Sequence, residues 1–243
     1  MASLALTFGD IYTQVSDFLR YSSPTGDTLT LVKDIVKRAY RRFLYPVHPE
    51  SGLLHTWSFL RRKGRLSTKI NEYRYQLPTD FVTMLTSPKM VAGENLLNPE
   101  YIDIAKFNGF RTKSTDGDVP QFYCVDIGEY HKEFGQLHEL KFWKTPNLVY
   151  NYEYEYVFEP QAPENSTDFL VGGVRASEVI LAMSLAEAEQ QEDEDSGVQA
   201  TRASKLLLAY MAWDKAYAMN AFGPGWDDAR QEDRPVTEET NGS

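Results

Sequence analysis

The segment YNYEYEYVFEP, residues 150–160, constrains the fold more than any other stretch of the chain, because aromatic and polar side chains alternate along it. An aromatic residue stands at every second position from Tyr150 to Phe158, while Asn151, Glu153 and Glu155 have the opposite parity. Side chains of a strand point alternately to opposite faces, so the segment predicts a strand with one aromatic face. Such a face suits either a platform that stacks on bases or sugars or the wall of a core. We predict the wall, because a small domain does not leave five large rings in water.

Helical periodicity is found on both sides of this strand. Near the N-terminus it follows a capping signal, in which Thr7 precedes Asp10 by three residues. A second helix is predicted from about Leu29 to Leu44, where Pro46 ends it, and LLHTWSFLRR predicts a further helical turn or two. Helix returns near Gly172 and again after the acidic run EQQEDEDSG. The residues expected to face a core in these four helices are Ile11, Val15, Phe18 and Leu19; Val32, Ile35, Val36, Ala39, Tyr40 and Phe43; Val179, Met183 and Ala186; and Leu206, Tyr210, Trp213 and Tyr217.

Between about Arg61 and Glu164 the period changes from 3.6 to 2. RLSTKINEYRYQLP predicts a hairpin with INE near its turn, and GQLHELKFWKTPN with LVYNYEYEYVFEP predicts a second strand pair joined at Pro146 and Asn147. We therefore predict an α+β protein. Residues 1–60 and 165–222 form a helical bundle from both chain ends, residues 61–164 form a small inserted antiparallel β domain, and residues 223–243 form a C-terminal arm.

Composition excludes several classes of protein. The chain is 42% hydrophobic and 25% charged, as globular proteins are, and no apolar run approaches the roughly 20 residues that cross a bilayer. MASLALTF lacks the pattern of a signal peptide, so we expect a soluble protein made in a cytoplasm, without a membrane partner. The single cysteine, Cys124, excludes an intrachain disulfide and a zinc site built on cysteines. A net charge of −10 argues against a protein that wraps nucleic acid.

Catalytic and cofactor motifs were sought and not found. The chain has no glycine-rich phosphate loop and no G-x-S-x-G elbow, and its four histidines, His48, His55, His131 and His138, lack metal-ligand spacing. Glu153 and Glu155 fall on one strand face about 7 Å apart, a separation that a carbohydrate-active enzyme uses. Acidic residues opposite an apolar face are also typical of any solvent-facing strand. We therefore expect no enzyme, no catalytic residue, no metal and no cofactor.

Charge is segregated along the chain. Residues 33–74 contain eleven basic and three acidic residues, whereas residues 187–243 contain thirteen acidic and five basic ones. Lys33, Lys37 and Arg41 are spaced to share one helix face. This face is either simply solvated or, with Arg61 and Arg62, contacts a neighbouring copy or partner in a head-to-tail assembly. A nucleic-acid-binding module that uses the basic region 33–74 is the alternative function.

The order of several short motifs resembles a known family. TFGDIYTQVSDFLRY is followed by AYRRFLYP, TWSFL, RLSTKINEYRYQLPTDF, GDVPQFYCV and LKFWKTPNLVYNYEYEY. This series resembles the head-to-tail adaptor, connector or gatekeeper proteins of tailed bacteriophages over about residues 8–220. The positions that carry the resemblance are Trp57 and Phe59, Tyr75 to Phe81, Pro120 and Tyr123, and Trp143 to Pro146. The loop from Ala92 to Asp118 matches no part of that pattern.

The resemblance implies a structural virion protein without an active site, assembled in the host cytoplasm. It implies a homo-oligomeric ring, commonly twelvefold, at the head-to-tail interface between the capsid portal and the tail or nozzle proteins. DNA would pass through its channel without sequence-specific binding. Adaptors of this kind use their C-terminal part to grip the portal, and here GPGW ends the last helix. Phe222 and Trp226 are therefore the expected portal-binding residues.

Overall fold

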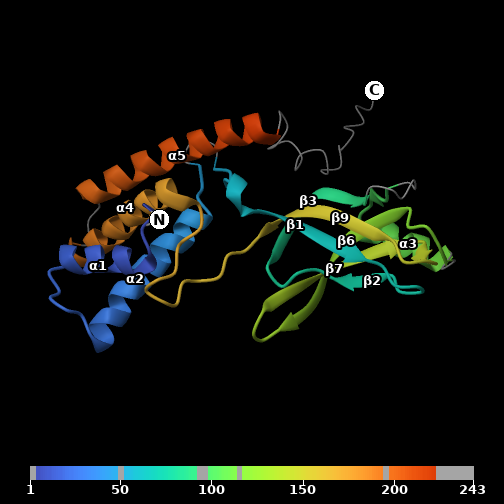
Figure 1. The fold of residues 1–243 in the computed structure, drawn as a ribbon, viewed down its shortest axis with the longest axis horizontal. Helices are drawn as coiled ribbons and strands as arrows, with labels where there is room; N and C mark the ends of the chain where they lie inside the picture. The colour runs from blue at the N-terminus through green and yellow to red at the C-terminus, as the bar shows by residue number, and fades with distance from the viewer. Residues whose placement is uncertain (1–3, 49–51, 92–97, 114–116, 194–196, 223–243) are drawn as a thin grey trace, which may run out of the picture. The chain divides into compact units, whose positions relative to one another are not determined.

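A computed structural model describes residues 4–48, 52–91, 98–113, 117–193 and 197–222 (Figure 1). The chain divides into two compact units. The helical unit comprises the described residues of 4–59 and 160–222, and the β unit comprises those of 60–159. The predicted α+β class is confirmed, with five α-helices and several small sheets among the described residues.

The helical unit takes two α-helices from each side of the β unit in the sequence. These are α1 (Phe8–Phe18), α2 (Gly26–Leu44), α4 (Gly173–Asp193) and α5 (Val198–Phe222). Helix α1 begins with the predicted capping box: the Asp10 amide donates to Thr7 Oγ1, and the Thr7 amide donates to the Asp10 carboxylate. Helix α4 contacts α1, α2 and α5, so it is the element around which the others pack.

The predicted apolar face of α2 is buried, and its six residues are all at most 4% exposed. This helix begins three residues before the predicted start and ends at Leu44, as predicted. The helical turn expected from LLHTWSFLRR is largely wrong. Only Ser58–Leu60 forms a 3-10 turn, η1, and strand β1 begins directly after it.

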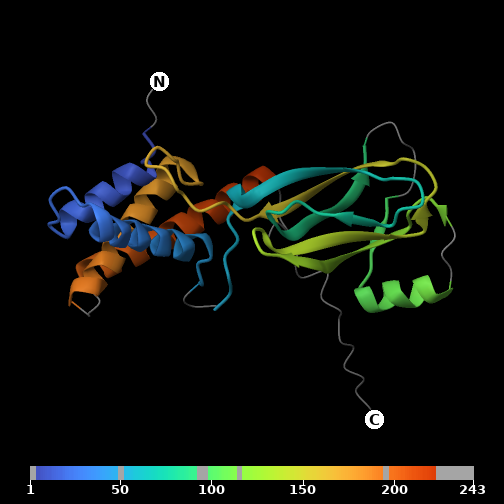
Figure 2. The same cartoon turned by 90° about the horizontal axis from the view of Figure 1, so that it is seen from below.

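The β unit contains nine strands among its described residues: β1 (Arg61–Ser67), β2 (Arg74–Gln76), β3 (Phe81–Met90), β4 (Glu100–Tyr101), β5 (Gly117–Asp118), β6 (Phe122–His131), β7 (Gly135–Trp143), β8 (Thr145–Pro146) and β9 (Asn151–Phe158). One sheet has the order β1-β9-β3 and a second has the order β2-β7-β6-β4. Strands β5 and β8 form a short parallel pair. Figure 2 shows the two larger sheets as facing layers, with α3 (Ile104–Lys113) beside them.

Both predicted hairpins are wrong. Strand β1 pairs along its whole length with β9, whereas β2 pairs with β7, so the first predicted pair is divided between two sheets. The turn between them is closed by the Tyr75 hydroxyl, which contacts the carbonyl oxygens of Lys69 and Glu72. Strands β7 and β9 likewise belong to different sheets, and the chain crosses from one to the other around Pro146. The turn signals in the sequence were correct, but they do not specify a partner strand.

The predicted aromatic wall is confirmed. Tyr150, Tyr152, Tyr154 and Tyr156 are each at most 4% exposed, and Phe158 is partly buried at the edge of the same cluster. The cluster also contains Phe142 of the opposite sheet, whose ring stacks on Tyr152 with a centroid distance of 5.1 Å. The tyrosine face is therefore the contact layer between the two larger sheets.

A glycine makes room for one of these rings. Gly64 of β1 lies opposite Tyr154 of β9, and a Cβ atom at position 64 would lie 2.4 Å from Cζ of that ring. The tyrosine thus covers the bare backbone of its cross-strand neighbour.

The outer strands of the first sheet are irregular or charged. Strand β3 has three register shifts along its pairing with β9. Strand β1, on the other side of β9, has the sequence RRKGRLS and carries four basic residues.

Candidate interaction surface

Five aromatic rings form a ladder from the core of the helical unit to its surface. Phe43 at the end of α2 stacks on Trp57 at 4.9 Å between ring centroids, and Trp57 lies 5.0 Å from Tyr210 of α5. The series continues along α5 to Trp213 and Tyr217, with centroid distances of 5.5 Å at each step. Trp57 is fully buried, whereas Trp213 is 40% and Tyr217 51% exposed, so the prediction that these two residues face a core is wrong. The buried stripe of α5 runs instead through Tyr210, Asp214 and Ala218. The aromatic ladder therefore joins the core to an exposed face of α5.

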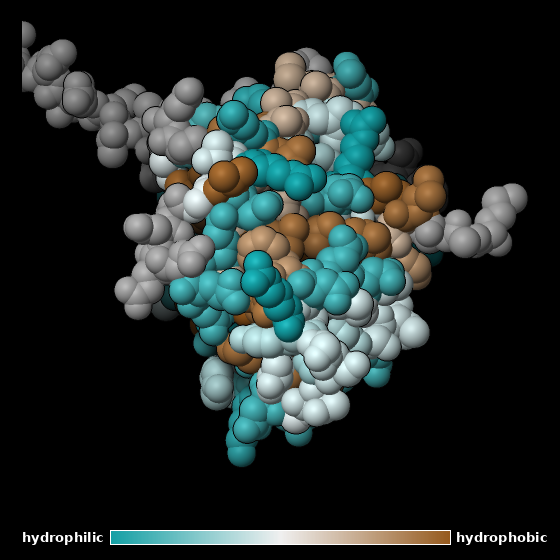
Figure 3. Space-filling model, turned by 90° about the vertical axis from the view of Figure 1, so that its left-hand side faces the viewer, coloured by the Kyte–Doolittle hydropathy of each residue, from teal (hydrophilic) through white to brown (hydrophobic). Residues whose placement is uncertain are grey.

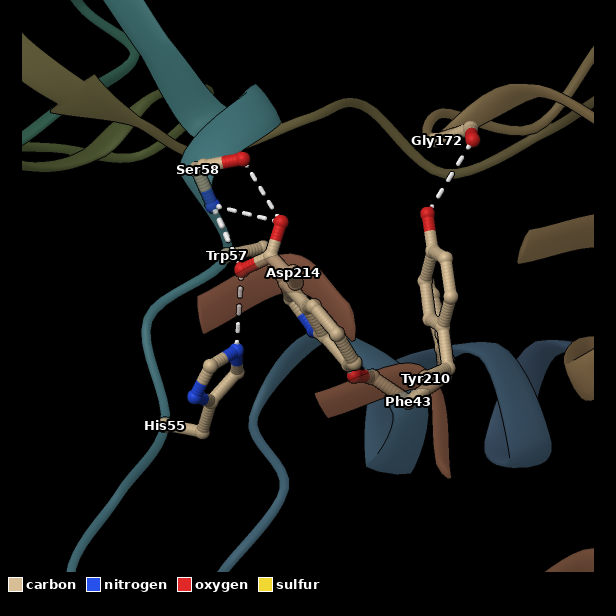
Figure 4. Close-up of polar contacts among 7 residues, drawn as sticks. All are labelled: Phe43, His55, Trp57, Ser58, Gly172, Tyr210 and Asp214. Atoms are coloured by element: carbon tan, nitrogen blue, oxygen red, sulfur yellow. Dashed lines mark hydrogen bonds and ion pairs between the residues drawn. The ribbon is translucent and has the colours of Figure 1, made fainter. Parts of the chain in front are cut away.

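A buried carboxylate fixes α5 beside the ladder (Figure 4). Asp214 is 1% exposed and occupies a core-facing position of the helix, one turn after Tyr210. The Ser58 hydroxyl donates to its Oδ1 at 2.6 Å, and the Ser58 amide donates to its Oδ2 at 3.1 Å. Nε2 of His55 lies 3.0 Å from the same Oδ2. Several hydrogen bonds thus compensate the burial of this carboxylate.

The neighbouring groups strengthen the same junction. The indole Nε1 of Trp57 donates to the carbonyl oxygen of Phe43 at 2.7 Å. The Tyr210 hydroxyl donates to the carbonyl oxygen of Gly172 at 3.2 Å. Burial, together with the nearby Asp214 carboxylate, raises the pKa of Tyr210 to about 12, so this hydroxyl keeps its proton at neutral pH. The segment around residues 55–58 and the loop before α4 are both attached to α5.

The Ser58, Asp214 and His55 side chains do not form a catalytic triad, although the residue types match one. In a triad the histidine lies between the serine and the carboxylate and removes the serine proton. Here the carboxylate lies between the other two, and both serine and histidine bind to it. The Ser58 hydroxyl therefore has no base to activate it in this cluster, and the arrangement holds α5 in place.

Helix α5 also exposes apolar side chains outside the ladder. Besides Trp213 and Tyr217, the large hydrophobic residues Leu208 and Met219 are 38% and 48% exposed on this helix. The exposed Arg175 guanidinium of α4 lies 4.5 Å from the centroid of the Trp213 ring. Exposed aromatic side chains with an arginine beside them, such as Trp213 with Arg175, are typical of protein contact sites. On the end of the helical unit shown in Figure 3, hydrophobic patches are separated by hydrophilic side chains.

The predicted basic contact residues are divided between the two units. Lys33, Lys37 and Arg41 lie on α2 of the helical unit at the predicted helical spacing. The Lys33 ammonium lies 5.5 Å from the centroid of the Tyr12 ring. Lys37 is half-buried and Arg41 is exposed, and neither forms an ion pair with another residue that the structure describes. Arg61 and Arg62 instead lie on β1 of the β unit.

Much of the basic charge of residues 33–74 faces carboxylates of the same chain. Among the described residues, five ion pairs involve this region: Arg42 with Glu187, Arg61 with Glu155, Arg62 with Asp80, Arg65 with Glu153, and Lys69 with Glu72. The Arg62 guanidinium also lies 4.0 Å from the centroid of the Phe158 ring. Carboxylates from outside the region therefore compensate four of its eight excess positive charges, at Arg42, Arg61, Arg62 and Arg65.

The predicted portal-binding residues lie at and after the end of α5. Phe222 is the last residue of this helix. Trp226 lies outside the described residues, as does the rest of the predicted C-terminal arm.

The candidate acid pair of the β unit is also engaged in ion pairs. Glu153 lies 2.8 Å from Arg65, and Glu155 pairs with Arg61 on the same strand pair. Among the residues that the structure describes, no group of three or more His, Cys, Asp or Glu side chains is arranged to hold a metal ion. No helix in the same residues is long and apolar enough to span a membrane. Burial raises the pKa of the Cys124 thiol to about 12.

Comparison with known proteins gives a family for the chain. The family model described as SU10 adaptor protein matches residues 6–238. The chain belongs to the SU10 adaptor protein family. This confirms the resemblance to bacteriophage head-to-tail adaptors, which are structural proteins of the virion, and the adaptor family implies contact with portal and tail proteins. No curated protein matches the chain.

Sequence reasoning did not identify Asp214, the buried carboxylate that joins α5 of the adaptor to Ser58 and His55. Tyr210, Asp214 and Ala218 repeat at the spacing of a core-facing stripe, so a carboxylate stands where the pattern demands an apolar residue. This conflict was the available signal for a buried hydrogen-bonded site. Its partners, Ser58 and His55, are more than 150 residues away in sequence, and no local pattern identifies them.

Proposed function

We propose that the chain is a head-to-tail adaptor that assembles into a ring of twelve copies between the capsid portal and the tail proteins. The ring would line part of the channel through which DNA passes, and it would assemble in the host cytoplasm before joining the virion. Membership of the adaptor family supports the structural role. The ring number, the position on the channel and the identity of the tail partner belong to the proposal.

The observation that carries the proposal is the exposed aromatic end of the ladder on α5. We infer that the helical unit is a bundle built from both chain ends and that it serves as a rigid platform for this face. The Tyr217 ring stacks on Trp213 and the Trp213 ring on Tyr210, which contacts the buried Trp57, so the exposed rings are held in a fixed orientation. Rigid aromatic side chains bind partners at a low cost in side-chain entropy.

The portal contact is assigned to the C-terminal end of the same helix. Helix α5 ends at Phe222, five residues after Tyr217, and Trp226 follows four residues later in the proposed arm 223–243. We therefore propose that Phe222 and Trp226 bind the portal together with the end of α5. An aromatic anchor that enters a pocket contributes a large share of interface energy.

Deletion of residues 223–243 tests this assignment. The truncated chain should stay folded, since the described core residues all precede the deletion, but it should no longer attach to portal-bearing capsids. The mass of particles isolated with and without portal measures attachment and the number of bound copies. Normal attachment of the truncated chain would show that the portal-binding site lies elsewhere, and the basic face of α2 would be the next candidate.

A second variant tests the α5 face itself. Replacing both Trp213 and Tyr217 by alanine should weaken attachment, because the change removes exposed rings and leaves the Asp214 junction intact. Tyr130→Ala is the matched control, since Tyr130 is 73% exposed at the end of β6. Attachment that drops equally in the control and the double variant would contradict a specific role for α5.

Lys33, Lys37 and Arg41 are proposed to face outward or to contact a neighbouring copy, and acidic residues to predominate on the channel wall. A channel for DNA works better when it does not bind phosphates tightly. Reconstruction of the assembled ring tests this placement, and these three residues lining a central pore would refute it. Because Arg61 and Arg62 already pair with carboxylates of their own chain, the proposed contact between copies rests on the α2 residues. The same ion pairs weaken the alternative of a nucleic-acid-binding module in residues 33–74.

A further inference from the structure

The segment that matched no family motif contains a helix beside a basic cavity. Helix α3 packs against β6 and β7, with Phe107 1% exposed at the contact. A cavity of about 270 Å³ lies beside this helix. We call this cavity the α3 pocket. Its polar lining residues are Tyr73, Arg74, Asn108, Arg111, Thr112 and Lys141.

The α3 pocket has three cations and no carboxylate in its lining. Lys141 is only 9% exposed and already has partners, since its ammonium lies 2.5 Å from Asp126 and 3.6 Å from Glu139. Arg74 and Arg111 form no ion pair with any residue that the structure describes. The Arg74 charge contributes to the lowered pKa of the Asp126 carboxyl, although the two groups form no direct ion pair. The pocket therefore presents two guanidinium groups that have no ion-pair partner among the described residues.

One aromatic ring holds both guanidinium groups near the cavity. The guanidinium carbon of Arg111 lies 3.6 Å from the centroid of the Tyr73 ring, and that of Arg74 lies 5.2 Å from it. The backbone of Tyr73 is fixed, because its carbonyl oxygen accepts a hydrogen bond from the Phe142 amide at 2.9 Å. Stacking on a ring orders a guanidinium while its N–H groups stay free to donate in its plane.

These features indicate the chemical class of the ligand. Arg111 comes from α3 and Arg74 from β2, so their donors belong to different elements, and Asn108 adds a neutral amide. A carboxylate has two coplanar oxygens and a single charge, whereas a phosphate has tetrahedral oxygens and up to two charges. A cavity of this size also lies below the range of about 300–1,000 Å³ that is typical of sites for drug-sized ligands.

We propose that the α3 pocket binds one phosphate-type oxyanion, with Arg74 and Arg111 as its charged ligands and Asn108 as a further donor. The group is either free phosphate or a phosphodiester of nucleic acid, which share this chemistry. The site lies wholly within the β unit and does not depend on the proposed ring or portal contact.

Calorimetric titration of the full-length protein with inorganic phosphate, at an ionic strength held constant with chloride, tests the site. The wild type should bind phosphate, and Arg111→Gln and Arg74→Gln should each bind at least tenfold more weakly. Arg111→Lys keeps the charge but loses the planar fork, so its affinity should fall between the two. The matched control is Lys106→Gln on the same helix, because Lys106 is exposed, pairs with Asp103 and does not line the pocket.

The far-ultraviolet circular dichroism of each variant shows whether it is folded, and Arg111→Lys keeps the test valid if a glutamine variant is not. Competition of a short DNA duplex with phosphate, lost in Arg111→Gln, would identify the phosphodiester as the source. Competition by phosphate monoesters alone would identify free phosphate. Equal phosphate affinity in all variants, no binding by the wild type, or acetate binding as tightly as phosphate would overturn the proposal.

Discussion

Replacement of Gly64 by alanine tests the packing between the two larger sheets most directly. The new methyl group would lie 2.4 Å from Cζ and 2.6 Å from Cε2 of the Tyr154 ring, well inside van der Waals contact. Tyr154 is 4% exposed and lies against Tyr156, with 5.9 Å between ring centroids, so its ring has no empty space to enter. One of the two strands must move, or the ring must leave its position in the core.

The expected cost follows from two opposing terms. Overpacking of a core typically costs about 1–3 kcal/mol. Replacing glycine restricts the unfolded chain and returns about 0.4–1 kcal/mol. We therefore expect Gly64→Ala to lower the free energy of unfolding by about 1–2 kcal/mol. For a chain of this length that corresponds to a decrease of about 2–8 °C in the melting temperature.

Gly109→Ala is the matched control in the same unit. Gly109 lies inside α3, and a Cβ atom there would meet nothing within 4 Å. The same chemical change should therefore raise stability, by about 0.5–1 kcal/mol, through helix propensity. Urea titration of both variants shows whether each change raises or lowers the free energy of unfolding. Hydrogen exchange at the β1 and β9 amides shows whether the effect of Gly64→Ala is local. A Gly64→Ala protein as stable as wild type would refute the close contact with Tyr154.

Three further predictions concern buried side chains. Tyr154→Ala should lower the free energy of unfolding by about 3–5 kcal/mol, measured by urea titration. An unchanged melting temperature would contradict the interpretation of the aromatic face as a core wall and favour a ligand platform. Asp214→Ala should cost about 3 kcal/mol, because it leaves the Ser58 amide and hydroxyl without their acceptor, while Asp214→Asn keeps an acceptor oxygen and should cost less. The pKa of Cys124 is raised from 9.0 to about 12, so the thiol ionises in the unfolded chain before it does in the native one, and stability should fall as the pH rises above about 9. Cys124→Ala should show a smaller loss of stability between pH 8 and pH 10.5 in urea titrations, and an identical loss would contradict the raised pKa.

Local patterns predicted the elements whose signals lie within a few residues. The capping box of α1 was readable because Thr7 and Asp10 contact each other across three residues. The tyrosine strand was readable because one of its faces is wholly aromatic and the other polar. Each signal reports on burial or on a hydrogen bond within a single element.

Local sequence patterns could not predict which strands pair with each other, nor the presence of helix α3. The partner of β1 is β9, about ninety residues later, and alternation in either strand shows only which face is buried. Among the residues of α3 whose burial the structure describes, Phe107 alone is buried, and Asn108 and Gly109 in the middle of the helix have weak helix propensity. The α3 pocket was unpredictable for the same reason, since it combines residues of β2, β7 and a helix that the pattern did not reveal.

The irregular and charged outer strands of the first sheet affect how copies of the chain behave before assembly. A flat exposed strand offers a row of unpaired backbone groups on which another copy can extend the sheet, and this is a route to aggregation. The register shifts of β3 interrupt such a row. On β1, the exposed Lys63, which forms no ion pair with a residue that the structure describes, places a charge on the edge. Sheet-to-sheet addition is therefore disfavoured at both strands, which leaves contacts with other proteins to side-chain surfaces that specify orientation.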